Sequence, residues 1–326
     1  MNKILKLISS VFIALLATLS ISKAEVKVVA SIKPIHSLVS YVMDGVGKPD
    51  VIVDGYNSPH GFSLKPSHAK MIENADLIIW VGEDLEAFLE KPLNTIAKKA
   101  VNIEIMNLSG IQKLKFREKN IFEGHDDHGH GHKEKKHDDH GHGHKKAKHD
   151  DHGHEGHAHG EHDPHVWLDP MNAKVIVKEI ENQLVKLDPD NSSKYKANSK
   201  KAQSELDNLT KNIKRNLKGN PRFVVFHDAY QYFENRFGIK VLGALTVNPD
   251  VLPGAEQLSE IREVIEHEKV NCLFSEPQFT PAIIKSIAKD TKIKTGVLDP
   301  LGATLDKGKG MYSELLQSMY ASFKGC

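Results

Sequence analysis

Short apolar runs alternate with amphipathic helical patterns along most of this chain of 326 residues. Residues 26–31 form one such run and a helical pattern follows at 34–42; residues 77–81 form another, followed by a helical pattern at 85–97. The runs are short and rich in Val and Ile, as expected for strands that are buried on both faces. Strands and helices that alternate in this way predict βαβ units and a parallel sheet. The expected fold class is therefore α/β.

The alternating pattern occurs twice. Further strands are expected at residues 51–53 and 101–103, and in the second half at 223–226, 241–242, 272–274 and 293–298. Between the halves, residues 192–218 lack Gly and Pro and carry a narrow apolar stripe, which predicts one long surface helix. We predict two lobes (25–190 and 219–326), each with a parallel sheet flanked by helices, joined by a linker helix (191–218). Ligands of such sheets bind at the carboxyl ends of strands, here in a cleft between the lobes.

The first 24 residues have the three parts of a secretory signal peptide. Lys3 and Lys6 precede an apolar run at residues 7–21, and Ser22-Lys23-Ala24 provides small residues for cleavage. A membrane anchor is the alternative, but the run is short for a bilayer span and contains four Ser or Thr residues. We expect cleavage after Ala24, export, and no membrane insertion of the mature chain. The net charge of +1 favours neither nucleic acid nor an anionic membrane as a partner.

Two cysteines, Cys272 and Cys326, are the only ones in the sequence. An even number in an exported chain indicates one disulfide, which would fix the C-terminus near residue 272. Closing a loop of this length stabilises a protein by roughly 4 kcal/mol in the chain-entropy treatment. A pair of free thiols is the alternative.

Fifteen of the twenty histidines lie between His125 and His165. This His-rich segment (residues 125–165) also contains Gly, Asp, Glu and Lys but little apolar surface, so it cannot offset the entropy of ordering. We predict a disordered loop over about 117–163. Neutral imidazole is a preferred ligand of divalent Zn, Ni and Cu, and many histidines offer interchangeable weak sites. The alternative is a charged linker whose metal affinity is incidental.

Three histidines stand where strands are expected to end. His60 follows the run at 51–53, His165 lies where the pattern resumes after the loop, and His227 ends the run at 223–226. A lone histidine at a strand end is more often a hydrogen-bonded loop residue than a ligand. Three of them at equivalent ends, in a chain with a His-rich segment, favour one shared metal site that joins the lobes. Three imidazoles suit Zn²⁺, whereas a site rich in carboxylates would favour Mn²⁺.

Other polar residues have weaker claims. Asp299 ends the last strand at the same edge and is a candidate fourth ligand, and Asp228 is a candidate for orienting the ring of His227. Structural or solvated roles are expected for three further histidines (His36, His68, His267), and helix capping for two aspartates that precede prolines (Asp169, Asp188).

Several motifs together resemble one family. They are Ser58-Pro59-His60, Leu64-Lys65-Pro66-Ser67, Asn74-Ala75-Asp76-Leu77, Trp80-Val81-Gly82, His165-Val166-Trp167-Leu168, Phe226-His227-Asp228-Ala229-Tyr230, Ser275-Glu276-Pro277-Gln278-Phe279 and Leu298-Asp299-Pro300-Leu301-Gly302. Over nearly the whole mature chain, this set resembles the zinc-uptake solute-binding proteins of bacterial ABC transporters (ZnuA-like, in the wider cluster A-I or adhesin-type group).

The resemblance implies two α/β lobes, a rigid linking helix and a metal ion in the cleft. It implies His60, His165 and His227 as ligands, and related manganese binders tend to have Glu at the position of His227. Some zinc binders have a carboxylate immediately before the first ligand, where this chain has Pro59, so the fourth ligand is water, Asp299 or a histidine of the loop. The Cys272–Cys326 pairing is also similar to that of the zinc branch.

The resulting hypothesis is a monomeric periplasmic carrier, without enzymatic activity, that captures Zn²⁺ as cargo and docks on the inner-membrane permease of an ABC importer. A periplasmic metal store or chaperone, with the loop as its main binding element, is the first alternative. A carrier for another divalent metal such as Mn²⁺ is the second. A zinc hydrolase is disfavoured because it needs a general base beside the bound water and the helical His-Glu-x-x-His pattern, which would supply one, is absent.

Overall fold

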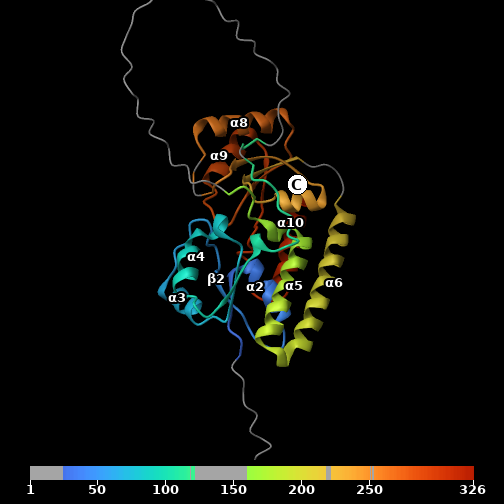
Figure 1. Ribbon diagram of the computed structural model, residues 1–326. Coiled ribbons are helices and arrows are strands. Elements are labelled where there is room, and N and C mark those ends of the chain that lie inside the picture. The colour runs from blue at the N-terminus through green and yellow to red at the C-terminus, as the bar shows by residue number, and fades with distance from the viewer. Residues whose placement is uncertain (1–24, 118, 122–159, 218–221, 250, 252) are drawn as a thin grey trace, which may run out of the picture.

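The computed structural model describes residues 25–117, 119–121, 160–217, 222–249, 251 and 253–326 (Figure 1). The predicted signal peptide (residues 1–24) and most of the predicted His-rich loop (residues 122–159) lie outside the described residues. The described residues form two parallel four-stranded sheets with helices around them. This is the α/β fold with two lobes that the alternating pattern predicts.

The N-terminal sheet has the order β2-β1-β3-β4. Its strands are β1 (Val28–Ile32), β2 (Asp50–Val53), β3 (Leu77–Trp80) and β4 (Val101–Glu104), and its connecting helices are α2 (Lys33–Val42), α3 (Pro66–Glu73) and α4 (Glu83–Thr95). Every residue of β1 and β3 is buried, because these central strands are covered on both faces. Proline occupies the first turn of α2 and α3, where the missing N–H would have no intrahelical partner.

The C-terminal sheet repeats this topology with the order β6-β5-β7-β8. Its strands are β5 (Arg222–His227), β6 (Lys240–Thr246), β7 (Cys272–Ser275) and β8 (Lys294–Val297), and its helices are α7 (Gln231–Phe237), α8 (Ala255–His267), α9 (Ala282–Thr291) and α10 (Met311–Gly325). All strand pairs are parallel, so the carboxyl ends of the strands meet at one edge of each sheet. His227, the last residue of β5, lies at that edge.

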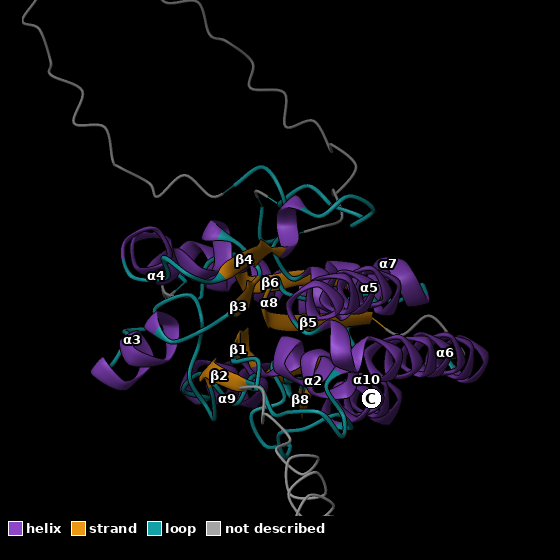
Figure 2. Ribbon diagram, turned by 60° about the horizontal axis from the view of Figure 1, so that its bottom comes forward, coloured by secondary structure: helices purple, strands orange, loops and turns teal. Residues whose placement is uncertain are grey.

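Helices α5 (Pro170–Leu187) and α6 (Ser192–Asn216) run side by side and connect the lobes (Figure 1). The C-terminal helix α10 packs against α2 and α6. In Figure 2, helices α2, α5, α6 and α10 lie together on the side of the molecule away from α3 and α4. One apolar core runs through both lobes and includes residues of β1, β5 and α10. A disulfide joins Cys272 of β7 to Cys326 at the end of α10. The lobes therefore share a core and are not hinged by the linker helix alone.

Both ends of the predicted loop are ordered, which corrects its expected limits. Lys115 and His162 form an antiparallel bridge, and Phe116 N–H donates to the carbonyl of Glu161. Asn120 then pairs with the edge strand β6, where its carbonyl accepts from Ala244 N–H. Paired backbone groups offset the entropy of ordering these residues, although most of their side chains are polar. The described residues at and beside the two ends of the predicted loop (112–117, 119–121 and 160–165) thus form a short clasp, which contacts the C-terminal lobe.

Glu86 is a carboxyl group with no exposed surface in the N-terminal lobe. Its Oε2 accepts hydrogen bonds from the backbone N–H groups of Val81 and Gly82. Burial raises the pKa of Glu86 to about 7, against the opposing effect of the hydrogen bonds from these two amides. Because the pKa of this carboxyl group is higher in the folded state, the folded protein keeps the proton over a pH range in which the unfolded chain has already lost it. Stability contributed by Glu86 is present at low pH and is lost as pH rises from about 4.5 through 7.

We predict that Glu86→Gln stabilises the protein by roughly 2 kcal/mol at pH 8 and has little effect at pH 5. The amide oxygen can still accept from both backbone groups, and no proton has to be lost. Thermal unfolding at the two pH values measures this difference. Glu90→Gln, on the exposed face of α4, is the matched control and should leave stability unchanged at both. A stabilisation that is equal at pH 5 and pH 8 would contradict the explanation.

Candidate metal centre

Three histidines from separate segments meet between the lobes. His60 stands on the loop after β2, His165 immediately precedes a short 3₁₀ helix (Val166–Leu168), and His227 ends β5. Each has one ring nitrogen in a group whose members lie within 4.8 Å of one another. Within the described residues, no other group of three or more His, Cys, Asp or Glu side chains has its potential ligand atoms within this distance of one another. The structure therefore brings together all three histidines that the sequence indicated.

The spacing of two ring nitrogens matches the edge of a tetrahedral zinc site. His165 Nε2 and His227 Nε2 are 3.3 Å apart, and the ring centroids of His60 lie 5.6 Å from those of both other histidines. Zn–N bonds of about 2.0–2.1 Å in a tetrahedron place neighbouring nitrogens roughly 3.3–3.4 Å apart. A metal ion can therefore bind to both Nε2 atoms with little movement of either ring.

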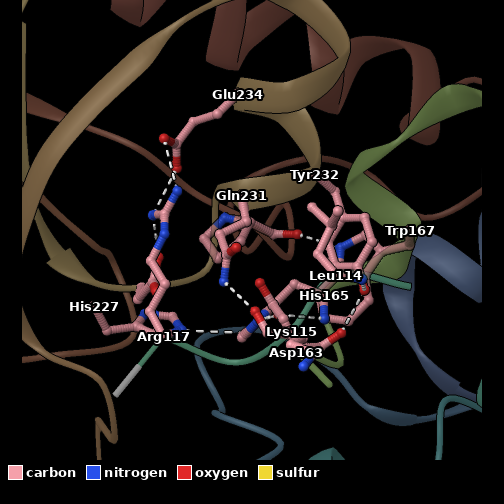
Figure 3. A network of polar contacts seen from close by, with 12 residues as sticks. Leu114, Lys115, Arg117, Asp163, His165, Trp167, His227, Gln231, Tyr232 and Glu234 are labelled. Carbon is pink, nitrogen blue, oxygen red and sulfur yellow. Dashed lines mark hydrogen bonds and ion pairs between the residues drawn. The ribbon is translucent and has the colours of Figure 1, made fainter. Parts of the chain in front are cut away.

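Carboxylates hold the far nitrogens of the two buried rings. His165 Nδ1 lies 2.7 Å from Asp163 Oδ1, and His227 Nδ1 lies 2.7 Å from Glu276 Oε1 (Figure 3 shows His165, Asp163 and His227). A ring that donates Nδ1–H to a carboxylate presents the lone pair of Nε2. Carboxylates in this position also orient the ring and make it a stronger donor to a metal. Sequence reasoning did not single out Asp163 or Glu276 for this role.

The pKa values of the two rings shift in opposite directions. Burial, together with the nearby charge of His227, lowers the pKa of His165 well below its usual range. Burial also acts to lower the pKa of His227, but the surrounding carboxyl groups, Glu276 foremost and then Asp228 and Asp163, together raise it above the ordinary value. His165 is thus neutral and ready to bind a metal at neutral pH. Because a metal ion binds the neutral ring, zinc binding to His227 is expected to weaken as pH falls.

The space between the rings is very small. The cavity that the three histidines line has a volume of about 10 Å³, with Trp167, Pro300 and Leu301 among its walls. A space of roughly 10–15 Å³ holds about one water molecule. A single metal ion therefore fits between the three rings.

Asp299 has a different role from the one expected of it. Its carboxylate accepts hydrogen bonds from three consecutive backbone N–H groups (Leu301, Gly302, Ala303) and from Gln278 Nε2. It does not belong to the group of potential metal-binding atoms that the three histidines form. The loop after β8 turns back on itself, so the carboxylate caps the loop backbone. The expectation of Asp299 as a fourth ligand is not supported by this geometry.

The loop that Asp299 caps is also bound from its other side. The ammonium group of Lys33 is almost fully buried and donates to the carbonyls of Gly302 and Leu305, each at 2.6 Å. Lys33 begins α2 in the N-terminal lobe, so this contact joins the lobes beside the metal pocket. The wall formed by Pro300 and Leu301 is therefore held by both lobes.

Asp228 likewise differs from its expected role, because Glu276 holds His227 in its place. Asp228 instead accepts from Arg117, whose guanidinium also forms two hydrogen bonds with Glu234 at 3.1 Å (Figure 3). Burial raises the pKa of Asp228 to about 8, although the charge of Arg117 opposes the shift. Arg117 belongs to the clasp, and both carboxylates belong to the C-terminal lobe. The clasp is thus attached to the wall that carries His227.

Most of the remaining residues follow their expected structural roles, but Asp188 does not cap a helix: its carboxylate accepts from the side chains of Asn191 and Tyr195 instead of a backbone N–H. His36 contacts the carbonyl of Pro49, and His68 Nδ1 accepts from the Lys65 backbone N–H at the start of α3. Asp169 caps α5 by accepting from Met171 N–H, and it also pairs with Arg236 of α7. That ion pair is a further contact between the lobes.

Fold and site together define a class: binding proteins with two α/β lobes around a buried pocket for one metal ion. The sequence profile of the ZnuA family, described as zinc-uptake complex component A, periplasmic, matches residues 28–326. The chain therefore belongs to this family of periplasmic zinc-uptake components.

Relatives agree over the full length. The high-affinity zinc uptake system protein ZnuA of Brucella abortus (strain 2308) is 45% identical over 98% of this chain and 97% of its own length. The protein with the same description from Yersinia pestis is 37% identical over 96% of this chain and 95% of its own.

Solved structures share the fold. A ZnuA deletion mutant with bound zinc matches 91% of this chain and 96% of its own with a TM-score of 0.70 at 20% identity. The solute-binding protein FpvC of Pseudomonas aeruginosa, in complex with Mn²⁺, matches 93% of this chain and 99% of its own with a TM-score of 0.71 at 18% identity.

Proposed function

We propose that this protein is the high-affinity zinc-binding component of an ABC-type importer, which captures Zn²⁺ outside the inner membrane and delivers it to the permease. The full-length relatives described as high-affinity zinc uptake proteins support this function. The observation that carries it is the cluster of three histidines in a cavity large enough for a single ion. Zinc is the cargo of the protein and not a resident cofactor.

We propose His60, His165 and His227 as the ligands of the zinc ion. The three histidines offer only nitrogen atoms to the metal. The nearby carboxylates already accept hydrogen bonds, Asp163 and Glu276 from histidine rings and Asp299 from backbone amides of its loop. A nitrogen-rich set favours Zn²⁺ over Mn²⁺, which prefers oxygen ligands. This donor set is the argument against the alternative of a manganese carrier, even though one structural neighbour binds Mn²⁺.

We further propose a periplasmic monomer that is exported by residues 1–24 and composed of lobes at 25–190 and 219–326 around a linker helix at 191–218. The observed α6 spans residues 192–216, and the described helices include none that is long and apolar enough to cross a bilayer. The partner would be an inner-membrane permease, because a solute-binding component releases its cargo there. The His-rich loop would supply weaker zinc sites beside the cleft.

Stoichiometry distinguishes the carrier from a metal store. We expect the full chain to bind one zinc ion tightly and several weakly, and a variant with residues 122–159 replaced by a short Gly-Ser linker to keep only the tight one. The replacement ends at residue 159 because Glu161 and His162 belong to the ordered clasp. Calorimetric titration against zinc, with and without a competing chelator, counts both kinds of site.

The weak sites should weaken as pH falls through about 6.5, the ordinary pKa of histidine. Faster zinc capture by the full chain than by the replaced variant, at limiting zinc, would indicate transfer from the loop to the cleft. Loss of the tight site together with the loop would refute the carrier and favour the metal store.

A further inference from the structure

Gln278 lines the metal cavity on the side of the C-terminal lobe, in the loop after β7. Its Nε2 donates to Asp299 Oδ1 at 2.8 Å. Its Oε1 is buried, and no hydrogen-bond donor among the described residues reaches it. An amide oxygen buried in this way costs about 1–3 kcal/mol unless it gains a donor. Other polar side chains of the cavity wall are engaged: Glu276 accepts from His227 and Tyr230, and Trp167 Nε1 donates to the carbonyl of Pro300.

The direction of the Gln278 amide is set by its neighbour. Asp299 accepts from backbone N–H groups on both of its oxygens, so it faces Gln278 as an acceptor. Only the NH₂ end of an amide can satisfy an acceptor, and the carbonyl end must therefore point away from Asp299. Asp299 is itself fixed by the loop that Lys33 binds from the N-terminal lobe. The oxygen of Gln278, a residue of the cavity wall, thus points away from Asp299, and no donor among the described residues reaches it.

A zinc ion held by three imidazoles has a fourth position, which a water molecule commonly fills. Zinc-bound water donates strongly because the ion withdraws charge from it. We propose that Gln278 Oε1 accepts a hydrogen bond from the water molecule that completes the coordination of the bound zinc. This inference rests on the proposed function. It makes Gln278 a residue that contacts the fourth ligand, and Asp299 a positioning residue that acts through Gln278.

The contact has a consequence for anions. Azide carries a negative charge and has no hydrogen to donate, so an amide oxygen facing the fourth position should disfavour it and retain water. Gln278→Met keeps a side chain of similar length and removes the acceptor. Loss of such a partner outside the ligand set typically weakens metal binding by 10–100-fold. We expect Gln278→Met to bind zinc roughly 10-fold more weakly and to bind azide roughly 10-fold more tightly.

The test uses the full chain with half an equivalent of Co²⁺, so that the tightest site fills first. Azide is titrated while the visible absorption of cobalt is followed, and zinc affinity is measured separately by chelator competition. Gln203→Met is the matched control, because Gln203 contacts Ser199 on α6 and lies outside the cavity. We expect this control to match the wild type in azide response, zinc affinity and melting temperature.

An unchanged azide response in Gln278→Met would overturn the proposal, whether or not zinc affinity falls, since a lower affinity alone also follows from loosened packing. A cobalt spectrum that differs from the wild type before azide is added would overturn it in favour of direct coordination by Oε1. Absence of a tight zinc or cobalt site in the wild-type protein would refute the proposed function itself. These results are distinguishable because the last requires no variant.

Discussion

Replacement of His227 by alanine is expected to lower the affinity for zinc by more than about 100-fold. The loss should exceed the 10–100-fold that removal of a partner outside the ligand set causes, because a bond to the metal itself is removed. The variant also leaves Glu276, which lies in contact with His227 Nδ1, as a buried carboxyl without its imidazole. Competition with a tight chelator measures the effect without interference from weak sites in the His-rich segment.

His267→Ala is the matched control for this variant. His267 ends α8 and is exposed, so the substitution removes one imidazole without touching the cavity. His165→Ala should reproduce the loss seen with His227→Ala, since the two Nε2 atoms are 3.3 Å apart and face the same ion. Retention of the tight site in both variants would show that zinc binds elsewhere.

Arg117→Met is expected to destabilise the protein by about 3 kcal/mol. The substitution removes the guanidinium that donates to two buried acidic side chains, Asp228 and Glu234, and buried acceptors left without their donor are costly. Methionine retains much of the apolar stem, so lost packing contributes little. Denaturant unfolding of the zinc-free protein measures the change directly.

The position of Arg117 also makes a second effect testable. Because Asp228 follows His227 directly, we expect Arg117→Met to weaken zinc binding by roughly 10-fold as the wall of the cavity relaxes. Arg262→Met is the control, since Arg262 pairs with Asp290 at the surface and should change stability by less than about 0.5 kcal/mol. Equal stability of the two variants would mean that the clasp does not secure the C-terminal lobe.

Local pattern was sufficient for most of the fold. The strand expected at residues 77–81 is β3, and the polar stretch at 192–218 contains the single helix α6. Both were predictable because burial on two faces requires a continuous apolar run, and a surface helix requires a narrow apolar stripe. The limits of the loop were not predictable in this way. Arg117 and His162 are polar, and their order comes from partners far away in sequence.

The residues of the site also fall into those that the sequence could indicate and those that it could not. His60, His165 and His227 could be selected because each stands where a strand or an ordered segment ends, and parallel strands bring such ends together. Asp299 passed the same criterion, but its loop folds back and its carboxylate binds three backbone amides. Glu276 was passed over although it follows β7 at the same edge, because nothing in the sequence indicates which carboxylate meets which ring.

Sequence alone was enough to predict the α/β class, the two lobes, the long helix and the clustering of three histidines, because these follow from periodicity and from residue types at strand ends. The tertiary structure decided how these parts are joined. It placed α10 across both lobes, attached the clasp through Arg117, and assigned Asp163 and Glu276 to the ligand rings. Such contacts join residues far apart in the chain, and their partners are chosen by distance and burial, which no local pattern contains.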